Sequence, residues 1–317
     1  MKKIFLILPF LLSAENAWIE VSALYWKPWE KALVATNKAS DIFTTDDFTE
    51  NPVIHPDFEW SWGYRLDGGY RFSCFWDISA SWTHYTSHVH QNRTVDQYAF
   101  LGMFPIWSLS DDIIAGDTIF QSHLQWKFLI NLLDVQFDYT WPYRCLDITP
   151  YFGVRSAWIK QYGNVRYQGG IFLIGIIEPG ISLEGSDDIQ MKNNYWGLGP
   201  RIGLSPKWQL GRGFSLNGDA AISSLYGFFH VLQKETYLDA TRFSNDKHIH
   251  RFCWISDFSA GLEWKTYFKC SALTLKADWE YHIFFHQFVL QRDRFHLIPE
   301  DKDLSTQGVT FSARLDF

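Results

Sequence analysis

The amino-acid sequence predicts an all-β protein that crosses a membrane as an antiparallel up-and-down β-barrel. Three observations predict it: apolar and polar residues alternate over many stretches, aromatic residues make up 18% of the chain, and short connections alternate with long ones. Alternation with a period of two is typical of β-strands, because successive side chains point to opposite faces of the sheet. The mean hydropathy of −0.16 fits strands between lipid and water better than it fits transmembrane helices.

The alternation is clearest in residues 58–71, FEWSWGYRLDGGYR, where one face is almost wholly aromatic and the other carries charged and small residues. A soluble β-sandwich would bury the aromatic face in its core, whereas a transmembrane barrel would place it in lipid and the charged face in a wet lumen. The connection lengths decide between the two. About four to six residues alternate with roughly 15 to 35, as in barrels with short periplasmic turns and long extracellular loops.

The N-terminal residues MKKIFLILPFLLSA predict a secretory signal peptide over positions 1–14. Lys2 and Lys3 form its positive region, an apolar run follows, and Ser13 and Ala14 provide a small-residue cleavage site. The rest of the chain contains no domain boundary, so we expect residues 15–317 to form a single barrel domain. An exported chain of this kind is expected in the outer membrane of a bacterium.

The first two strands are expected at residues 18–26 and 58–71, with a polar, proline-containing loop between them. A short turn at residues 72–75 precedes a third strand at 76–83. Residues 84–117 contain glycine, proline and paired acids, and we expect a second long loop there.

The alternation changes phase within residues 118–141, where we expect the fourth strand. Apolar residues occupy the even positions up to Ile130 and the odd positions from Leu133 onward. A β-bulge inside one long strand would produce this slip, and so would a tight turn at Asn131 and Leu132 between two strands. We therefore expect about ten strands, with eight or twelve as alternatives.

The second half of the chain repeats the same scheme of strand, short turn, strand and long loop. Ten strands return the chain to the side on which it began, as the even strand number of single-chain bacterial barrels requires. The remaining strands are expected near residues 152–158, 196–208, 214–228, 254–268, 273–283 and 309–317, with polar loops up to residue 188 and at 234–251 and 291–305.

The C-terminal run VTFSARLDF ends in Phe317, with apolar residues at alternate positions before it. It resembles the terminal signal of proteins that the outer-membrane assembly machinery inserts. Residues 151–161 (YFGVRSAWIKQ), 195–221 (YWGLGPRIGLSPKWQLGRGFSLNGDAA) and 308–317 (GVTFSARLDF) resemble the Legionella-type major outer membrane protein family. This resemblance implies a pore-forming outer-membrane barrel, with outer-membrane lipid and the assembly machinery as its partners.

The lumen face is the best candidate for a functional surface. Rings of charge can set the selectivity of a pore, and ten strands leave little room inside a barrel. We therefore predict a narrow diffusion channel for small solutes that also has a structural role in the envelope. The alternative is that these charges pair with one another and plug the lumen, which leaves a structural or adhesive barrel that acts through its loops. The candidate pore-lining residues are Glu59, Arg65, Asp67, Asp77, Lys127, Asp134, Asp138, Arg155, Arg201, Lys207, Asp219, Glu263, Lys265, Lys276, Asp278, Glu280, Arg314 and Asp316.

Two histidine pairs and three acidic pairs are possible metal ligands. His88 with His90, and His248 with His250, place two imidazoles on one strand face. No third ligand is indicated for either pair, and the acidic pairs lack the spacing of a calcium loop. We therefore expect no metal and no cofactor. The acidic pairs are Asp46–Asp47, Asp111–Asp112 and Asp187–Asp188.

Barrel enzymes are the least favoured alternative. A barrel phospholipase would show a Ser-Asn-Gly run, which the sequence lacks. A barrel protease would place Asp-Asp and Asp-His pairs near the rim, and Asp111–Asp112 and Asp246/His248 could imitate these. Acidic loops also produce such pairs, so we predict no enzymatic activity.

Three cysteines, Cys74, Cys145 and Cys270, fall in predicted short turns that would face the oxidising periplasm. We predict that some of them crosslink to neighbouring envelope proteins; reduced or internally paired cysteines are the alternative. Without Lys2 and Lys3 the chain carries 26 basic and 35 acidic residues, a formal charge of −9. This balance argues against nucleic acid as a partner.

Overall fold

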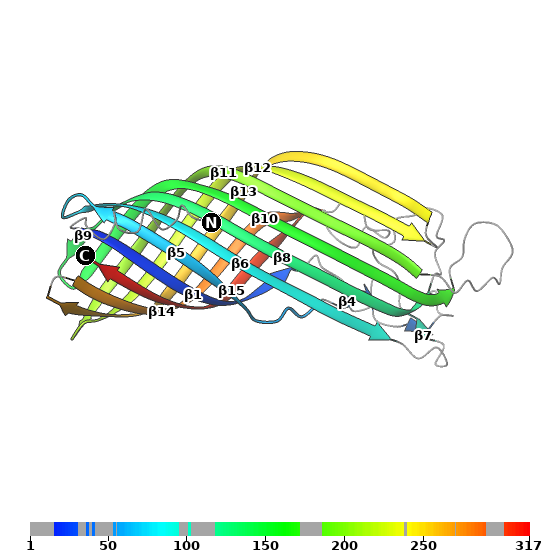
Figure 1. The fold of residues 1–317 in the computed structure, drawn as a ribbon, viewed down its shortest axis with the longest axis horizontal. Helices are drawn as coiled ribbons and strands as arrows, with labels where there is room; N and C mark the ends of the chain where they lie inside the picture. Colours follow the sequence, from blue (N-terminus) through cyan, green and yellow to red (C-terminus); the bar gives the residue numbers. More distant parts are fainter. Residues whose placement is uncertain are drawn as a thin grey trace, which may run out of the picture.

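The computed structural model describes residues 16–30, 36–37, 40–41, 53–54, 56–94, 101–102, 118–171, 186–237, 240–269, 271–289 and 301–317. Among these residues, ten long strands form one closed antiparallel barrel (Figure 1). The strands are β1 (Ala17–Glu30), β5 (Ser61–Arg71), β6 (Trp76–Thr94), β8 (Thr118–Tyr139), β10 (Leu146–Ile171), β11 (Ser186–Gly211), β12 (Phe214–Tyr237), β13 (Ala240–Phe268), β14 (Ser271–Val289) and β15 (Asp301–Asp316). The predicted antiparallel barrel of about ten strands is therefore confirmed.

The topology is up-and-down: each long strand pairs with the long strands before and after it, and β15 pairs with β1 to close the sheet. A three-residue strand, β9 (Trp141–Tyr143), continues the hairpin between β8 and β10. Two small two-stranded sheets lie outside the barrel sheet, between β2 (Thr36–Asn37) and β4 (Val53–Ile54) and between β3 (Ser40–Asp41) and β7 (Leu101–Gly102). Among the described residues, no helix is long and apolar enough to cross a membrane.

Short turns gather at one end of the barrel, together with the C-terminus (Figure 1); we call it the turn end and the opposite end the loop end. The amide of Phe317 donates to the carbonyl of Ala17 at 2.9 Å. This bond holds the end of β15 to the start of β1, the two strands that close the barrel. The turn between β11 and β12 contains Gly211 and Gly213 at φ +99° and +84°. Glycine adopts this left-handed region without steric cost, which is why the chain can reverse there so tightly.

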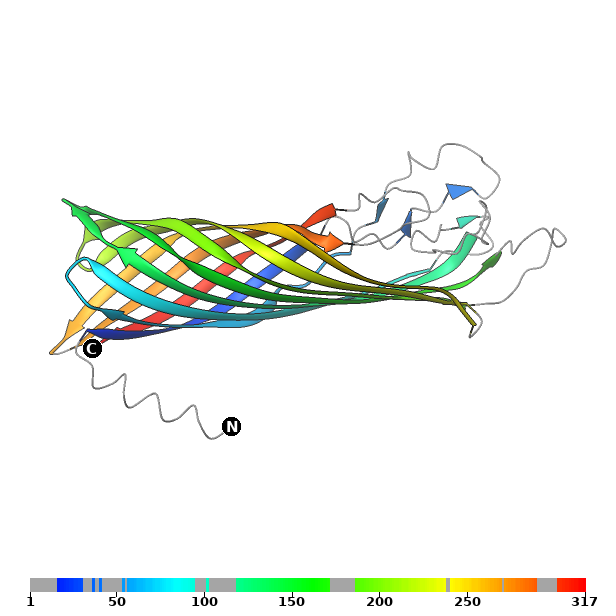
Figure 2. The ribbon, with the colours of Figure 1, turned by 90° about the horizontal axis from the view of Figure 1, so that it is seen from above.

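The strands differ greatly in length. β5 has 11 residues and β1 has 14, whereas β10 and β11 have 26 each and β13 has 29. A tilted strand needs about 9–11 residues to cross a bilayer. The long strands therefore project well beyond the membrane at the loop end, past the ends of β14 and β15 (Figure 2).

The side chains divide the barrel into two zones. Near the turn end, apolar residues such as Val135, Phe152 and Ile202 are exposed on the outer wall, and the inner face is polar. Near the loop end the pattern inverts: Trp126, Phe128 and other apolar residues are buried inside, and the outer wall is polar. Lipid covers the outer wall in the first zone and water covers it in the second, so the apolar face of each strand changes sides between the two zones.

This inversion explains the phase slip in β8. The pairing of β8 with β6 and with β10 is continuous through Leu132 and Leu133, with neither a bulge nor a turn. The predicted β-bulge and the predicted turn at Asn131 and Leu132 were therefore both wrong. Leu132 points into the lumen and Leu133 points outward to lipid, so the change of phase marks the membrane boundary.

Parts of four predicted loops are strand. β6 continues to Thr94, beyond the predicted end at Thr83, and β12 and β13 continue through most of residues 234–251. β10 likewise continues to Ile171 within the loop predicted up to residue 188, and β15 begins at Asp301 within the loop predicted at 291–305. These segments have polar outer walls, which made them resemble solvated loops. The register of β12 and β13 runs up to the pair Tyr237 and Ala240, so this hairpin is closed by a short connection at the loop end.

Candidate functional site

The inner face near the turn end surrounds a polar cavity of about 410 Å³. Its lining comes from all ten long strands and contains acidic, basic and hydroxyl side chains. Seven of these groups form one connected cluster across the lumen, which we call the charged belt. Its members are Arg65, Asp134, Arg155, Arg201, Asp257, Glu280 and His282.

Arg155 of β10 is the centre of the charged belt. Its guanidinium donates two hydrogen bonds to Asp134 on the neighbouring β8, both at 2.7 Å, and a third to Asp257 on β13 at 2.7 Å. Arg201 of β11 donates to the same Asp257 oxygen. Planar guanidinium groups bind carboxylates at two points with fixed geometry. Two arginines and two acids from four strands are thus held as one unit.

The charged belt continues to the opposite wall through His282. The ring of this histidine lies 2.8 Å from Asp257 and 3.2 Å from Glu280, measured between hydrogen-bonding atoms. Glu280 in turn accepts two hydrogen bonds from Arg65 of β5, at 2.9 and 2.8 Å. The charged belt therefore spans the lumen from β5 to β8, with three guanidinium groups set against three carboxylates.

Further pairs lie beside the charged belt on the same inner face. Lys276 donates to Glu20 at 2.9 Å, and the Tyr151 hydroxyl lies 3.0 Å from Asp219. Lys207 donates to Glu263. Because most inner charges have an opposite charge in contact, the turn-end lumen resembles a packed polar core more than an open ring of charge.

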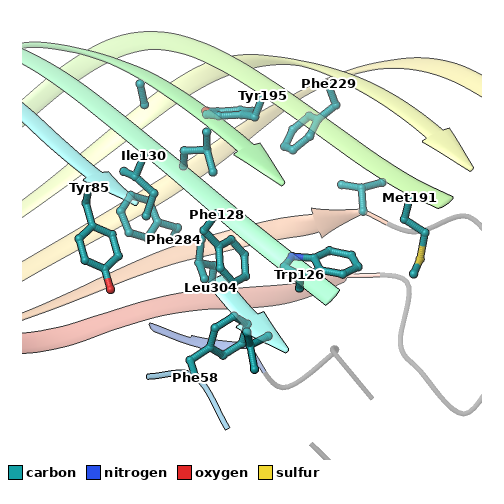
Figure 3. Packing of buried hydrophobic residues seen from close by; sticks show 14 of the residues in the cluster. Phe58, Tyr85, Trp126, Phe128, Ile130, Met191, Tyr195, Phe229, Phe284 and Leu304 are labelled. Carbon is teal, nitrogen blue, oxygen red and sulfur yellow. The ribbon is translucent and has the colours of Figure 1, made fainter. Parts of the chain in front are cut away.

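Above the charged belt, the loop-end lumen contains a cluster of buried apolar side chains, which we call the apolar plug, together with buried polar residues such as Gln161 and Gln233. Figure 3 labels ten members of the apolar plug, whose side chains converge on the inside of the barrel. The rings of Phe58 and Phe128 lie 5.0 Å apart, and the ring of Trp26 lies 5.4 Å from that of Tyr85. The labelled members are Phe58, Tyr85, Trp126, Phe128, Ile130, Met191, Tyr195, Phe229, Phe284 and Leu304.

A distortion of β14 closes the apolar plug from one side. The pairing of β14 with β15 shifts register between Phe284 and Phe288, and His286 has a φ of +57°. The carbonyl of Gln287 then accepts a hydrogen bond from Asn193 of β11 at 2.8 Å. The strands β12 and β13 separate β11 from β14 in the sheet, so this bond crosses the lumen.

Glycines make room for the largest inner rings. A Cβ atom at Gly163 of β10 would lie 2.0 Å from Cζ3 of Trp126, and one at Gly227 of β12 would lie 2.1 Å from Cε2 of Tyr195. Real Cβ atoms do not approach so closely, so each ring packs directly on a neighbouring backbone. This close packing supports a filled lumen.

Most of the residues predicted to line the pore lie around the cavity, but four do not. Lys127 lies on the outer wall of β8, because it falls in the zone where the apolar face of that strand points inward. Glu59 is exposed in the segment before β5. Lys265 and Asp316 pair at 3.9 Å on the inner face without lining the cavity. Around the cavity lie Arg65, Asp67, Asp77, Asp134, Asp138, Arg155, Arg201, Lys207, Asp219, Glu263, Lys276, Asp278, Glu280 and Arg314.

Three important members of the lumen were missed from the sequence: Glu20, Asp257 and His282. All three occupy inward positions of alternating strands, so the phase of each strand could have identified them. His282 lies two residues after the buried Glu280, which places both on one face of the strand. The pairing between strands that brings these residues together cannot be read from one strand alone.

The structure places the predicted acidic pairs and the Asp246/His248 pair in different environments. Asp46–Asp47 and Asp111–Asp112 lie outside the described residues. Asp187 is buried on the inner face, whereas Asp188 points outward and pairs with Arg166 at 2.5 Å, so the two carboxylates do not share a site. Asp246 and His248 lie on the outer wall of β13 and point away from the lumen.

The cysteines are also placed in part. Cys74 and Cys145 are exposed and unpaired in short turns at the turn end, and Cys253 is buried. Cys270 lies outside the described residues. A crosslink to another envelope protein stays a prediction.

Comparison with known proteins extends these observations. No curated protein matches the chain. Among solved structures, the outer membrane protease OmpT from Escherichia coli aligns with a TM-score of 0.44 at 10% identity, covering 96% of this chain and 97% of that one. Ail, the attachment invasion locus protein of Yersinia pestis, aligns with a TM-score of 0.27 at 10% identity, over 95% and 99% of the two chains. A major outer membrane protein from Thermus thermophilus aligns with a TM-score of 0.27 at 11% identity, over 96% and 100%.

At these TM-scores the structural likenesses carry no argument about activity. The family comparison is stronger, because the model described as "Legionella pneumophila major outer membrane protein precursor" matches residues 13–317. This range contains all the strands of the barrel and the three segments whose sequences resemble that family. The chain therefore belongs to the Legionella pneumophila major outer membrane protein family and is a β-barrel of the bacterial outer membrane.

Proposed function

We propose that this protein is a barrel with a closed lumen that strengthens the outer membrane and carries its loop end outward into the medium. One observation supports this proposal most: the apolar plug, with the hydrogen bond from Asn193 to the Gln287 carbonyl, lies across the lumen above the charged belt. Hydrophobic constrictions oppose the passage of water and ions. The exposed loop end is then the surface that meets the surroundings.

The strand lengths fit this role. The five strands from β8 to β13 have 22 to 29 residues, about twice what a bilayer crossing requires. Their extensions carry the polar outer wall of the barrel beyond the lipid at the loop end. An ordinary pore needs no such wall.

Planar-bilayer recording of the purified, refolded protein tests this proposal. A closed lumen predicts a bilayer that stays silent at moderate voltage after the protein has inserted. Insertion itself is checked by protease protection of the turn end in liposomes. Regular conductance steps from inserted wild-type protein would contradict the closed lumen.

A narrow diffusion channel for small solutes is the second candidate. The polar cavity of about 410 Å³ near the turn end favours it, because a hydrated, charged chamber supplies one part of a permeation path. In this case conduction requires the apolar plug to move aside. Conductance steps whose ion selectivity changes when Arg65 is replaced by Gln would support the channel over the closed barrel.

An enzymatic role has less support. The Asp246 and His248 side chains face outward from β13 and do not meet the inner charges. We therefore propose that the barrel has no protease activity. Incubating it with a library of fluorogenic peptides provides a direct check, since hydrolysis that His248→Gln abolishes would contradict this.

A further inference from the structure

Three side chains that could bind a metal gather on the outer wall near the loop end. His230 lies on β12, and Asp246 and His248 lie on β13. Phe229 and Val231, the sequence neighbours of His230, are buried in the lumen, so the alternation of the strand turns His230 outward. The site is thus separate from the charged belt and accessible to the surrounding medium.

The register of the two strands brings these groups together. His230 and His248 are direct partners across the ladder, and their rings stack 4.6 Å apart at an interplanar angle of 7°. Nε2 of His230 lies 2.8 Å from Oδ1 of Asp246. One ligand atom from each of the three residues lies within 4.8 Å of the others.

We propose that His230, Asp246 and His248 bind a divalent transition-metal ion of the Zn²⁺ type. Imidazole nitrogens suit Zn²⁺, Cu²⁺ and Ni²⁺, and a carboxylate commonly completes a set of three protein ligands, with water in the open position. Two atoms bound tetrahedrally to one Zn²⁺ at about 2.1 Å lie about 3.4 Å apart. The most distant ligand atoms must therefore close by up to about 1.4 Å, which exposed side chains achieve by rotating about their χ angles.

The histidine pair on β6 provides a natural comparison. His88 and His90 also lie on the outer wall, with ring centroids 5.6 Å apart at an angle of 68°. Among the described residues, only the group around His248 combines three potential ligands in this way. From the sequence alone, His88/His90 and His248/His250 are equivalent histidine pairs. The structure distinguishes them, because β12 supplies His230 beside His248.

A bound ion would join β12 to β13 beyond the membrane, where the two strands extend furthest. It would replace the hydrogen bond between His230 and Asp246 with two bonds to the metal. Because imidazole must be neutral to bind a metal, protons compete with the ion and binding weakens in acid.

Isothermal titration of the refolded mature chain with ZnCl₂ tests this proposal, using protein without an affinity tag and freed of metal by chelation. We expect one Zn²⁺ per chain. His248→Gln and Asp246→Asn should each weaken binding at least about tenfold, since each removes one ligand. The matched control, His88→Gln with His90→Gln, should bind as the wild type does.

Folding of each variant is checked by its heat-dependent migration on gels, which does not require the metal. Absence of stoichiometric Zn²⁺ binding by folded wild-type protein would overturn the proposal. So would binding that the His88 and His90 substitutions remove while His248→Gln leaves it intact. None of these outcomes depends on whether the lumen conducts, so the proposal stands or falls separately from the closed barrel.

Discussion

Arg155 and Asp257 are joined by a hydrogen bond of 2.7 Å across the lumen, although β11 and β12 separate their strands in the sheet. Asp257 also accepts from Arg201 and contacts His282. This one carboxylate of β13 therefore links its strand to β10, β11 and β14. In a barrel with so few strands, single side chains can bridge the lumen, so charges on distant strands pair directly.

Replacing Asp257 by Ala should destabilise the barrel severely. The substitution leaves Arg155 and Arg201 buried without the carboxylate that they share, and loss of one partner from a buried ion pair costs about 3–5 kcal/mol. The change is measured as a lower urea midpoint for unfolding in detergent micelles.

Arg166→Gln is the matched control for this experiment. Its pair with Asp188 lies at the loop end and is half-exposed, and surface pairs contribute about 0–1 kcal/mol. Equal losses in the two variants would contradict the special role of the charged belt.

Gly163→Ala should also destabilise the protein, although it adds only one methyl group. Its Cβ atom would overlap the indole of Trp126, and overpacking of this kind costs about 1–3 kcal/mol. At Gly68 a Cβ atom would meet nothing closer than 3.8 Å, so Gly68→Ala should leave the unfolding midpoint nearly unchanged.

A second substitution identifies the cause. If the clash with Trp126 is responsible, adding Trp126→Ala to Gly163→Ala should cost less than the two single changes together. Strictly additive losses would show that the ring does not pack on Gly163.

Ile202→Arg tests the lipid-facing outer wall. Ile202 is 58% exposed and lies between Phe152 and Ile222, which also point outward. Arginine on the lipid face near the middle of the membrane costs about 2–4 kcal/mol. Gln190→Arg, on the outer wall near the loop end, should change the stability by at most about 0.5 kcal/mol. Unfolding from liposomes distinguishes the two, and equal effects would show that lipid does not cover Ile202.

Much of the barrel could be predicted from the sequence, because each membrane crossing imposes its own alternation. The antiparallel barrel, its strand number near ten and most of its inward charges followed from that period of two. The prediction failed where the environment changes along a strand. Trp126 and Ile130 seemed to share an outer face with lipid, yet they fill the apolar plug, and Lys127 between them points outward to water.

The contacts across the lumen were beyond reach for a different reason. Strand phase gives the face of Asp257 and of Arg155, but not the stagger that brings them to the same height. The third ligand beside His248 was missed in the same way, since His230 meets it only through the register of β12 with β13. Sequence periodicity determines faces, and register determines partners.

The cysteines should differ in reactivity. Cys74 and Cys145 are exposed at the turn end, whereas Cys253 is buried in the apolar plug. A maleimide reagent added to the folded protein should label the first two within minutes and Cys253 only after unfolding; mass spectrometry of peptides reads the result. Rapid labelling of Cys253 in the folded state would show that the apolar plug is open to water.

The closed lumen is tested most directly by opening it. Trp126→Ala combined with Phe284→Ala removes two large members of the apolar plug, and Trp158→Ala combined with Trp196→Ala removes as many rings from the outer wall. Each protein is recorded in the same planar bilayer at the same salt concentration. The account predicts that wild type and the outer-wall variant stay silent and that the plug variant conducts; wild-type conductance equal to that of the plug variant would contradict it.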